Sequence, residues 1–231
     1  MITLDDVRVA VPAIRRGDPE KVLLDDVTLD LAEHRIAVVG ANGSGKSTLL
    51  RLLNGLRTPT HGTVRVHGHD TVADGKRVRA LVGFIFTDPL MQLLMSTPVE
   101  DIELSLRSVV PGRSGRMARA RELLDERGIG HVAHQSIYDL SGGERQLVAL
   151  TSVLAVEPSI IVADEPTTLL DLRNRSALEG VFARLEQQVI FSTHDLDFAR
   201  IADRVLVVDG GRVVADDEPA PALAHYVRLM A

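Results

Sequence analysis

The fold is decided by Gly40-Ala41-Asn42-Gly43-Ser44-Gly45-Lys46-Ser47-Thr48, which matches the phosphate-binding pattern G-x-x-x-x-G-K-[ST]. The apolar, β-branched run 36–39 before it is typical of a buried parallel strand, and the leucines after it predict a helix with one apolar side. A strand, a glycine-rich turn and a helix aim backbone N–H groups at phosphate oxygens. We predict that this stretch binds a nucleoside triphosphate, in preference to the alternative of a glycine-rich turn before an ordinary helix.

Lysine is rare in this chain, which contains 23 arginines but only Lys21, Lys46 and Lys76. A compact ammonium group is therefore kept at position 46, where Lys46 is expected to reach the β- and γ-phosphates. The hydroxyl of Ser47 is expected to ligate Mg²⁺. The motif thus implies a nucleoside triphosphate together with Mg²⁺ as the ligand.

Composition narrows the possible classes of protein. The chain has 231 residues, a net charge of −6, seven aromatic residues and no cysteine. Disulfides and thiolate metal sites are therefore excluded, and an acidic chain with few aromatics argues against nucleic-acid binding. The longest apolar stretch, 147–156, is shorter than the roughly 20 residues that span a bilayer, and the start at Met1 lacks the pattern of a signal peptide. We expect a globular protein on the cytoplasmic side.

Apolar runs along the chain predict an α/β fold. The runs 3–11 and 22–31 are expected to be antiparallel strands beside the nucleotide-binding core. Further strands alternate with helical stretches, as in a mostly parallel sheet, and are expected at 81–86, 159–163, 188–192 and 204–208. We expect a single domain, 1–231, with its core at 1–86 and 157–231 and an inserted α-helical subdomain at about 87–156. The basic residues of this insertion are expected to form a solvated face: Arg113, Arg116, Arg119 and Arg121.

Two carboxylates follow the predicted strand 159–163. Asp164, at the end of the strand, is suited to contact Mg²⁺, and Glu165 can orient or deprotonate an attacking water. Two adjacent acids after a strand can also form a helix cap. Together with the phosphate-binding stretch, they favour hydrolysis of the bound triphosphate.

The segment Leu140-Ser141-Gly142-Gly143-Glu144-Arg145-Gln146 begins another predicted helix. A serine cap followed by two glycines makes a helix end that can bind an anion. Because it lies between the phosphate-binding stretch and the Asp164-Glu165 pair, the segment resembles the L-S-G-G-Q signature of the ATP-binding cassette ATPases. The resemblance covers essentially the whole chain and implies a P-loop NTPase core of the RecA-like type, with ATP and Mg²⁺ as ligands.

The resemblance also assigns expected roles to residues outside the phosphate-binding stretch. In the family the signature of one subunit covers the γ-phosphate held by the other, which implies a homodimer closed by two ATP molecules. Ser141, Gly142, Gly143 and Glu144 would act in this way across the dimer. Phe191-Ser192-Thr193-His194-Asp195 is similar to the segment whose histidine contacts the γ-phosphate and helps to hold the attacking water, and Thr168-Leu169-Leu170-Asp171 to the segment whose aspartate communicates across the dimer.

Two positions depart from the family pattern. The family has a glutamine that links Mg²⁺ and the attacking water to the membrane partner, and this chain has Thr87 there. A threonine hydroxyl is shorter and would need a bridging water, while Gln92 is not a direct replacement. The family also stacks adenine on an aromatic residue near the N-terminus, where this chain has none. Arg15 or Arg16 could stack instead, or the base could be loosely held.

The stretch Phe86-Thr87-Asp88-Pro89, with Thr97-Pro98-Val99 and the residues that follow, resembles the energy-coupling factor type of vitamin and metal-ion importer. In that subgroup the helix after Thr-Pro helps to form a groove for a coupling helix of the membrane subunit. Val99, Ile102 and Leu106 are therefore expected to contact the partner, with Glu100, Asp101 and Glu103 facing a basic coupling helix. The alternative is a core helix of the insertion, and both readings can hold.

The resemblance therefore implies an ATPase subunit on the cytoplasmic face of the membrane, bound to a transmembrane coupling subunit and a substrate-binding membrane subunit. The segments Phe-Thr-Asp-Pro and Thr-Leu-Leu-Asp resemble the biotin-system ATPase more than those of cobalt, nickel or other vitamin importers. Two other classes are less compatible with the chain. A cassette protein that acts on ribosomes or DNA ends usually has two cassettes or a basic surface, and a small-molecule kinase has no use for a water-orienting glutamate.

Overall fold

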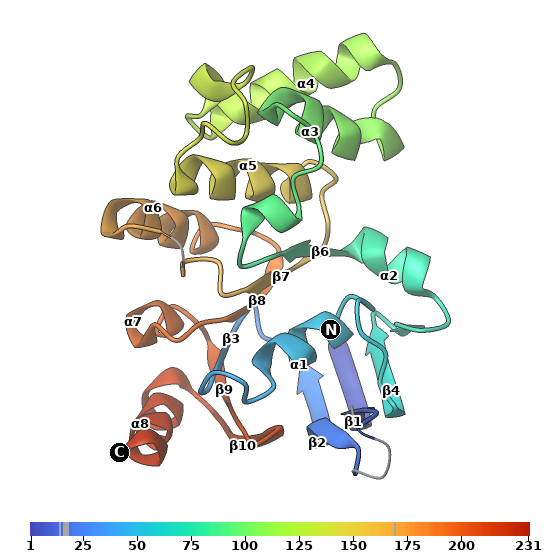
Figure 1. Ribbon diagram of the computed structural model, residues 1–231, viewed down its shortest axis with the longest axis vertical. Coiled ribbons are helices and arrows are strands. Elements are labelled where there is room, and N and C mark those ends of the chain that lie inside the picture. The colour runs from blue at the N-terminus through green and yellow to red at the C-terminus, as the bar shows by residue number, and fades with distance from the viewer. Residues whose placement is uncertain (14, 16–18, 169) are drawn as a thin grey trace.

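The computed structural model describes residues 1–13, 15, 19–168 and 170–231. Its first layer is an antiparallel sheet of four strands in the order β2-β1-β4-β5 (Figure 1). These strands are β1 (Ile2–Val11), β2 (Lys21–Leu31), β4 (His61–Val66) and β5 (His69–Asp70). The two antiparallel strands predicted at the start of the chain are confirmed, and they pair with each other from Ile2↔Leu31 to Val11↔Lys21.

The second layer is a sheet of six strands in the order β10-β9-β3-β8-β7-β6. All neighbouring pairs are parallel except β9 with β10, so the predicted mostly parallel sheet is confirmed. The strands are β3 (Arg35–Val39), β6 (Val82–Ile85), β7 (Ile160–Asp164), β8 (Gln188–Ser192), β9 (Arg204–Asp209) and β10 (Arg212–Asp217). Leu81, predicted to open a strand, instead ends helix α2 (Gly75–Leu81).

Side chains alternate between two cores on the faces of this sheet, as the two-residue period of a strand requires. On β3, Ile36 and Val38 belong to the core between the two sheets, which helix α1 (Lys46–Leu52) completes. Ala37 and Val39 belong to the core on the opposite face. That face is covered by α6 (Leu172–Phe182), α7 (Leu196–Ala199) and α8 (Pro219–Met230), and it contains the packed rings of Phe182, Phe191 and Phe198.

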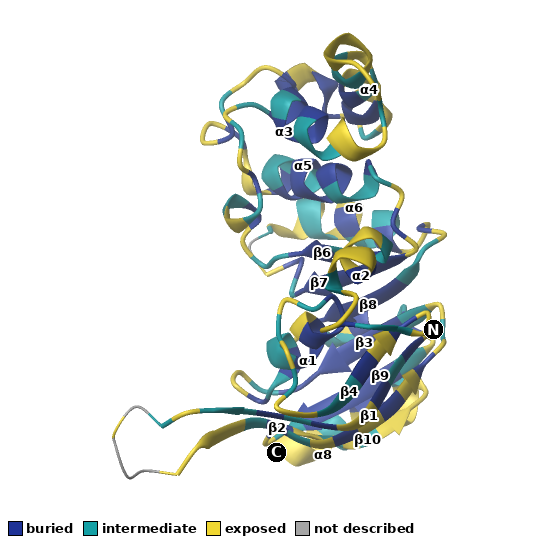
Figure 2. Ribbon diagram, turned by 90° about the vertical axis from the view of Figure 1, so that its right-hand side faces the viewer, coloured by how far each residue is buried: buried dark blue, intermediate teal, exposed yellow. Residues whose placement is uncertain are grey.

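The helical part has a third core, formed by residues between Leu93 and Ala155. Its elements are η1 (Pro89–Met91), α3 (Pro98–Ser105), η2 (Leu106–Ser108), α4 (Arg113–Glu126), η3 (Gly130–Val132) and α5 (Gly142–Leu154). Helix α5 joins the two parts, because Leu150 packs in the core of the sheet while Val148 packs in the helical core. Figure 2 shows buried residues along the facing sides of α3 and α5 and exposed ones on α4. The division into 1–86, 87–156 and 157–231 stays a prediction.

The side chains predicted to line a partner groove are buried in this third core. Val99, Ile102 and Leu106 are 2%, 0% and 1% exposed. The expectation that they contact a partner directly is therefore wrong, and the alternative of a core helix describes them. An aspartate at Ile102 or Leu106 would place an unpaired carboxylate in this core and unfold it.

Two acidic residues nearby are also buried and bind partners within the chain. Asp101 is 4% exposed and accepts the N–H groups of Leu94 and Met95 and the hydroxyl of Ser152. Glu103 is 3% exposed, and its Oε1 lies 2.6 Å from Nε of Arg116. Both carboxylates are therefore buried and bound within this chain, in contrast to the expectation that they face a basic helix of the partner. Arg116 likewise departs from the predicted solvated face, because a buried carboxylate needs a partner.

Among the described residues, no helix combines the length and apolar character needed to cross a membrane.

Candidate active site

The phosphate-binding stretch connects β3 to α1 and needs backbone conformations that glycine accepts readily. Gly45 has φ 117°, and a Cβ atom there would lie 2.9 Å from the carbonyl oxygen of Leu23. Lys46 is 4% exposed. Its Nζ donates to the carbonyl oxygens of Gly40 at 2.8 Å and Ala41 at 3.1 Å. The ammonium group is therefore held inside the loop, as required of a cation that meets phosphate oxygens entering it.

The two residues predicted to contact Mg²⁺ lie side by side. Ser47 Oγ donates to Oδ1 of Asp164 at 2.9 Å, across 117 positions of sequence. Asp164 ends β7, is 3% exposed, and accepts a second hydroxyl from Ser192 at 2.9 Å. Hydroxyl and carboxylate oxygens are the hard ligands that Mg²⁺ prefers. The donor set therefore fits this ion.

Glu165 is surrounded by the other candidate catalytic residues. Its Oε1 lies 3.6 Å from Nζ of Lys46. Its Oε2 lies 3.2 Å from Nδ1 of His194 and accepts the hydroxyl of Thr168 at 3.0 Å. The side chain of Glu165 is 17% exposed and that of His194 is 55% exposed. A carboxylate that is mostly buried but reaches solvent beside a histidine is well placed to accept a proton from water.

A cavity of about 410 Å³ opens over the loop and Glu165. Sequence reasoning missed its outer wall, which comes from β2 and from the turn between β9 and β10. Lys21 is one of only three lysines in the chain, a signal that the sequence analysis used for Lys46 alone. The cavity is lined by Lys21, Val22, Leu23, Asn42, Gly43, Gly45, Lys46, Ser47, Thr48, Glu165, Gly210 and Gly211.

No aromatic side chain lines this cavity among the residues that the structure describes. Arg15 is exposed and does not line it either. Arg16, the second candidate for stacking on a base, lies outside the described residues. The described wall of the cavity away from the phosphate-binding stretch therefore consists of Lys21, Val22, Leu23, Gly210 and Gly211, without a ring.

The signature segment forms an exposed helix start away from that cavity. Ser141 caps α5 and accepts the N–H of Glu144, while Glu144 accepts the N–H and the hydroxyl of Ser141 at 2.8 and 2.6 Å. These hydrogen bonds to Ser141, helped by His131 at 3.2 Å, lower the pKa of Glu144 below its ordinary value of 4.5. None of the four signature residues lines the cavity over the phosphate-binding stretch.

Gly143 has a role within its own chain. A Cβ atom at this position would lie 2.3 Å from Cγ of Asn174 on α6. Asn174 in turn donates its N–H to Oδ1 of Asp171 at 2.8 Å, which caps α6. The second glycine of the signature therefore allows α5 to approach the segment that carries Asp171, the predicted coupling residue.

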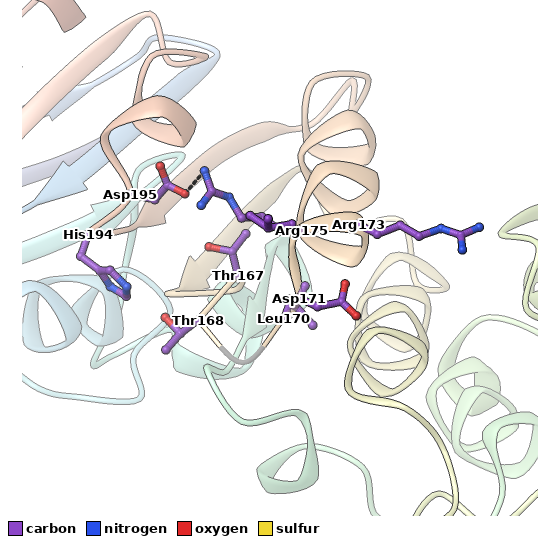
Figure 3. A pocket seen from close by; sticks show the side chains of 9 residues that line it. Thr167, Thr168, Leu170, Asp171, Arg173, Arg175, His194 and Asp195 are labelled. Carbon is purple, nitrogen blue, oxygen red and sulfur yellow. Dashed lines mark ion pairs between the residues drawn. The ribbon is translucent and has the colours of Figure 1, made fainter.

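A larger cavity of about 710 Å³ lies between the start of α6 and His194. Figure 3 shows Arg175 reaching from α6 toward Asp195, with which it forms an ion pair, while Arg173 points the other way. Asp195 also accepts the N–H groups of Asp197 and Phe198 and so caps α7. The ion pair connects the helix that begins after Asp171 to the residue that follows His194. Leu169, in the same predicted coupling segment, lies outside the described residues.

Thr87 does not reach into either cavity. Its Oγ1 donates to the carbonyl oxygen of Asp164 at 2.7 Å. Gln92, the nearby glutamine, donates its amide to the carbonyl oxygen of Ala149 at 2.9 Å and is held against α5. Both side chains therefore use their donors within the fold.

Comparison with known proteins identifies the family to which this chain is similar. The family described as ABC transporter matches residues 24–168. A putative ABC transporter ATP-binding protein of Bartonella henselae is 44% identical over 208 residues, covering 90% of this chain and 92% of the relative. The biotin transport ATP-binding protein BioM of Rhizobium etli is 43% identical over 211 residues, covering 91% of this chain and 94% of the relative. A dimeric structure of the ATP-binding cassette MJ0796 in a post-hydrolysis state, bound to ADP and Pi, superimposes with a TM-score of 0.84 at 29% identity, covering 95% of this chain and 99% of that one.

The two-sheet core, the phosphate-binding stretch and the acidic pair define a nucleotide-hydrolysing protein of the P-loop class. The chain belongs to the ABC transporter family, and its activity is the hydrolysis of ATP coupled to transport.

Proposed function

We propose that this chain is the ATP-hydrolysing subunit of an energy-coupling factor importer for biotin, and that it closes as a homodimer around two ATP·Mg²⁺ sites. The observation that carries the hydrolytic part is a set of linked contacts beside one cavity. Lys46, Ser47 and Glu165 line this cavity, while Asp164 contacts Ser47 and His194 contacts Glu165. Biotin as cargo is supported by the 43% identity to the biotin transport protein of Rhizobium etli.

The residues of the site have distinct roles in this proposal. When bound, ATP supplies the phosphoryl group, and Mg²⁺ neutralises part of its charge. Lys46 and the backbone of the phosphate-binding stretch hold the β- and γ-phosphates, and the oxygens of Ser47 and Asp164 hold the metal. Glu165 orients a water and accepts its proton, while His194 supports Glu165 from the solvent side at 3.2 Å. Positioning and charge neutralisation supply most of the catalysis in such reactions.

The homodimer is supported by what one chain lacks. The phosphate-binding stretch is open to solvent, and the signature helix start is exposed elsewhere on the molecule. A second copy would bring its Ser141 to the open site. Replacing Ser141 by Arg would put a bulky cation at that contact, so the monomer should bind ATP normally in an equilibrium titration but fail to dimerise with ATP in size-exclusion chromatography. Loss of ATP binding by the monomer would instead mean that the signature acts in its own subunit.

The membrane partner is expected to bind near η1, where the structure exposes apolar side chains. Met91 and Leu94 are 73% and 76% exposed, in the segment that joins Thr87 to α3. They replace the buried Val99, Ile102 and Leu106 as candidates for contact with the transmembrane coupling subunit at the cytoplasmic face. Met91 and Leu94 are only three positions apart, and a contiguous apolar patch formed by such neighbours is the kind of surface that marks an interface.

Co-expression with the membrane proteins encoded beside this chain tests the importer and its cargo. Replacing Met91 and Leu94 together by Asp should abolish co-purification and uptake of labelled biotin while the isolated protein stays folded. Val72→Asp is the matched control, because Val72 is 58% exposed and lies elsewhere. Uptake of cobalt, nickel or another vitamin instead of biotin would overturn the cargo. If the unmutated chain co-purified with no membrane protein, the importer proposal would be wrong.

A further inference from the structure

The peptide group between Asp164 and Glu165 is held by a hydroxyl group on each side. Thr87, which lies just beyond β6, donates Oγ1–H to the carbonyl oxygen of Asp164 at 2.7 Å. Ser192, the last residue of β8, accepts the N–H of Glu165 on its Oγ at 3.0 Å. Since β6 and β8 flank β7 in the sheet, the peptide is fixed from both neighbouring strands.

This peptide leads into an unusual backbone conformation. Glu165 has φ 47°, in the left-handed region that residues other than glycine adopt at an energetic cost. The conformation turns the chain sharply away from β7, and the carboxylate then points to Lys46 at 3.6 Å and His194 at 3.2 Å. Strained residues persist when their surroundings hold them, and here two hydroxyls do so.

We propose that Thr87 and Ser192 are positioning residues that clamp the Asp164–Glu165 peptide and thereby aim the Glu165 carboxylate. The inference rests on the proposed role of Glu165 as the residue that orients water. Ser192 also donates to Oδ1 of Asp164 at 2.9 Å, so one buried side chain sets both the backbone and the metal-binding carboxylate. Thr87 acts on the backbone, unlike the metal-linked and water-linked glutamine that the family resemblance implied for this position.

Isosteric substitutions separate the hydroxyl from the volume of the side chain. Thr87→Val removes the hydroxyl at almost constant shape, and Thr87→Ser keeps it. Thr60→Val is the control, because Thr60, just before β4, also donates its Oγ1–H to a carbonyl oxygen, that of Arg8 on β1 at 3.0 Å, outside the site. Ser192→Ala tests the clamp from its other side and replaces Thr87→Val if that variant does not fold.

The first measurement is amide hydrogen exchange of the nucleotide-free protein. Because Pro166 has no amide hydrogen, exchange in segment 164–166 reports only on Asp164 and Glu165. We expect Thr87→Val to speed exchange there about tenfold, the scale of one lost hydrogen bond, and to leave other strands unchanged. Thr87→Ser and Thr60→Val should exchange in this segment like the unmutated protein.

The second measurement is steady-state ATP hydrolysis. Thr87→Val should lower kcat about fivefold to tenfold with KM for ATP within about twofold, and Thr87→Ser should restore it. Thr60→Val should leave both constants unchanged. Unchanged exchange and kcat in Thr87→Val would overturn the clamp. If Glu165→Gln kept normal turnover, the role of Glu165 would be wrong, while the exchange experiment would still decide whether Thr87 holds the peptide.

Discussion

Asp164 and Glu165 at the end of β7, and Asp101 and Glu103 on α3, are both mostly buried pairs of carboxylates, but their partners differ in kind. Asp101 is saturated by two N–H groups and a hydroxyl, and Glu103 by arginine side chains of the same helical part. The β7 pair instead contacts Lys46, Ser47 and His194, beside a cavity that Glu165 itself lines. We therefore infer that the α3 pair serves the fold, whereas the β7 pair, beside open space, is the one that we propose for chemistry.

The largest effect should come from the isosteric change Glu165→Gln. It removes the proton acceptor, so kcat for ATP should fall about 10²-fold or more, the scale of general-base catalysis. ATP binding should persist, and the protein should accumulate as an ATP-bound dimer in size-exclusion chromatography. The thermal midpoint should not fall. Normal turnover in this variant would mean that Glu165, like the carboxylates of α3, has a structural role only.

A smaller effect on turnover is expected at the ion pair between Arg175 and Asp195. Arg175→Met should lower kcat about tenfold with KM little changed, because the segment that carries His194 loses its tie to α6. Arg173→Met is the control, because Arg173 is exposed on the same helix and points away from Asp195. Equal behaviour of the two variants would mean that the ion pair does not position His194.

The same isosteric change at Glu103 should act on stability instead of turnover. Glu103→Gln should lower the thermal midpoint by several degrees at pH 7 and leave kcat unchanged at permissive temperature. The hydrogen bond from Arg116 holds the pKa of Glu103 below its ordinary value of 4.5, so its stabilising contribution is present above that pH and is lost as pH falls through the lowered pKa. The difference between the variant and the parent should therefore shrink at acidic pH. A lowered kcat in Glu103→Gln would contradict the purely structural role that we assign to the carboxylates of α3.

The smallest effect concerns the base of the nucleotide. Stacking on an aromatic residue is worth about 1–3 kcal/mol per base in nucleic-acid sites, and the described lining of the cavity contains no ring. GTP should therefore compete with ATP within roughly tenfold in equilibrium binding. A preference above a thousandfold would reveal an adenine site that the described residues lack.

The residues that the sequence singled out around β7 do lie close together in the structure, because the motifs that carry them are local. A glycine-rich turn needs its own residues, and strand ends of a parallel sheet meet at one edge. Lys21 to Leu23 and Gly210-Gly211 were missed, because pairing between distant strands brings them to the cavity. Thr87 was expected to face a ligand, and only the structure shows its hydroxyl on the backbone of Asp164.

The α3 region was harder to predict, because an apolar helix stripe has the same spacing whether it faces a core or a partner. The periodicity that includes Val99, Ile102 and Leu106 could not distinguish the two, and their burial decides for the core. Arg116 was expected on a solvated face, but it pairs with the buried Glu103, 13 positions earlier in the sequence, and local sequence does not reveal this contact.

The left-handed backbone at Glu165 also bears on how this protein responds to selection. A glycine at 165 would relieve a strain of about 1–3 kcal/mol, so the position exchanges stability for activity. Directed evolution that selected for heat resistance alone would favour glycine or asparagine there. The resulting proteins would be more stable but would not hydrolyse ATP. A thermostability screen of this chain therefore has to read out turnover in the same step.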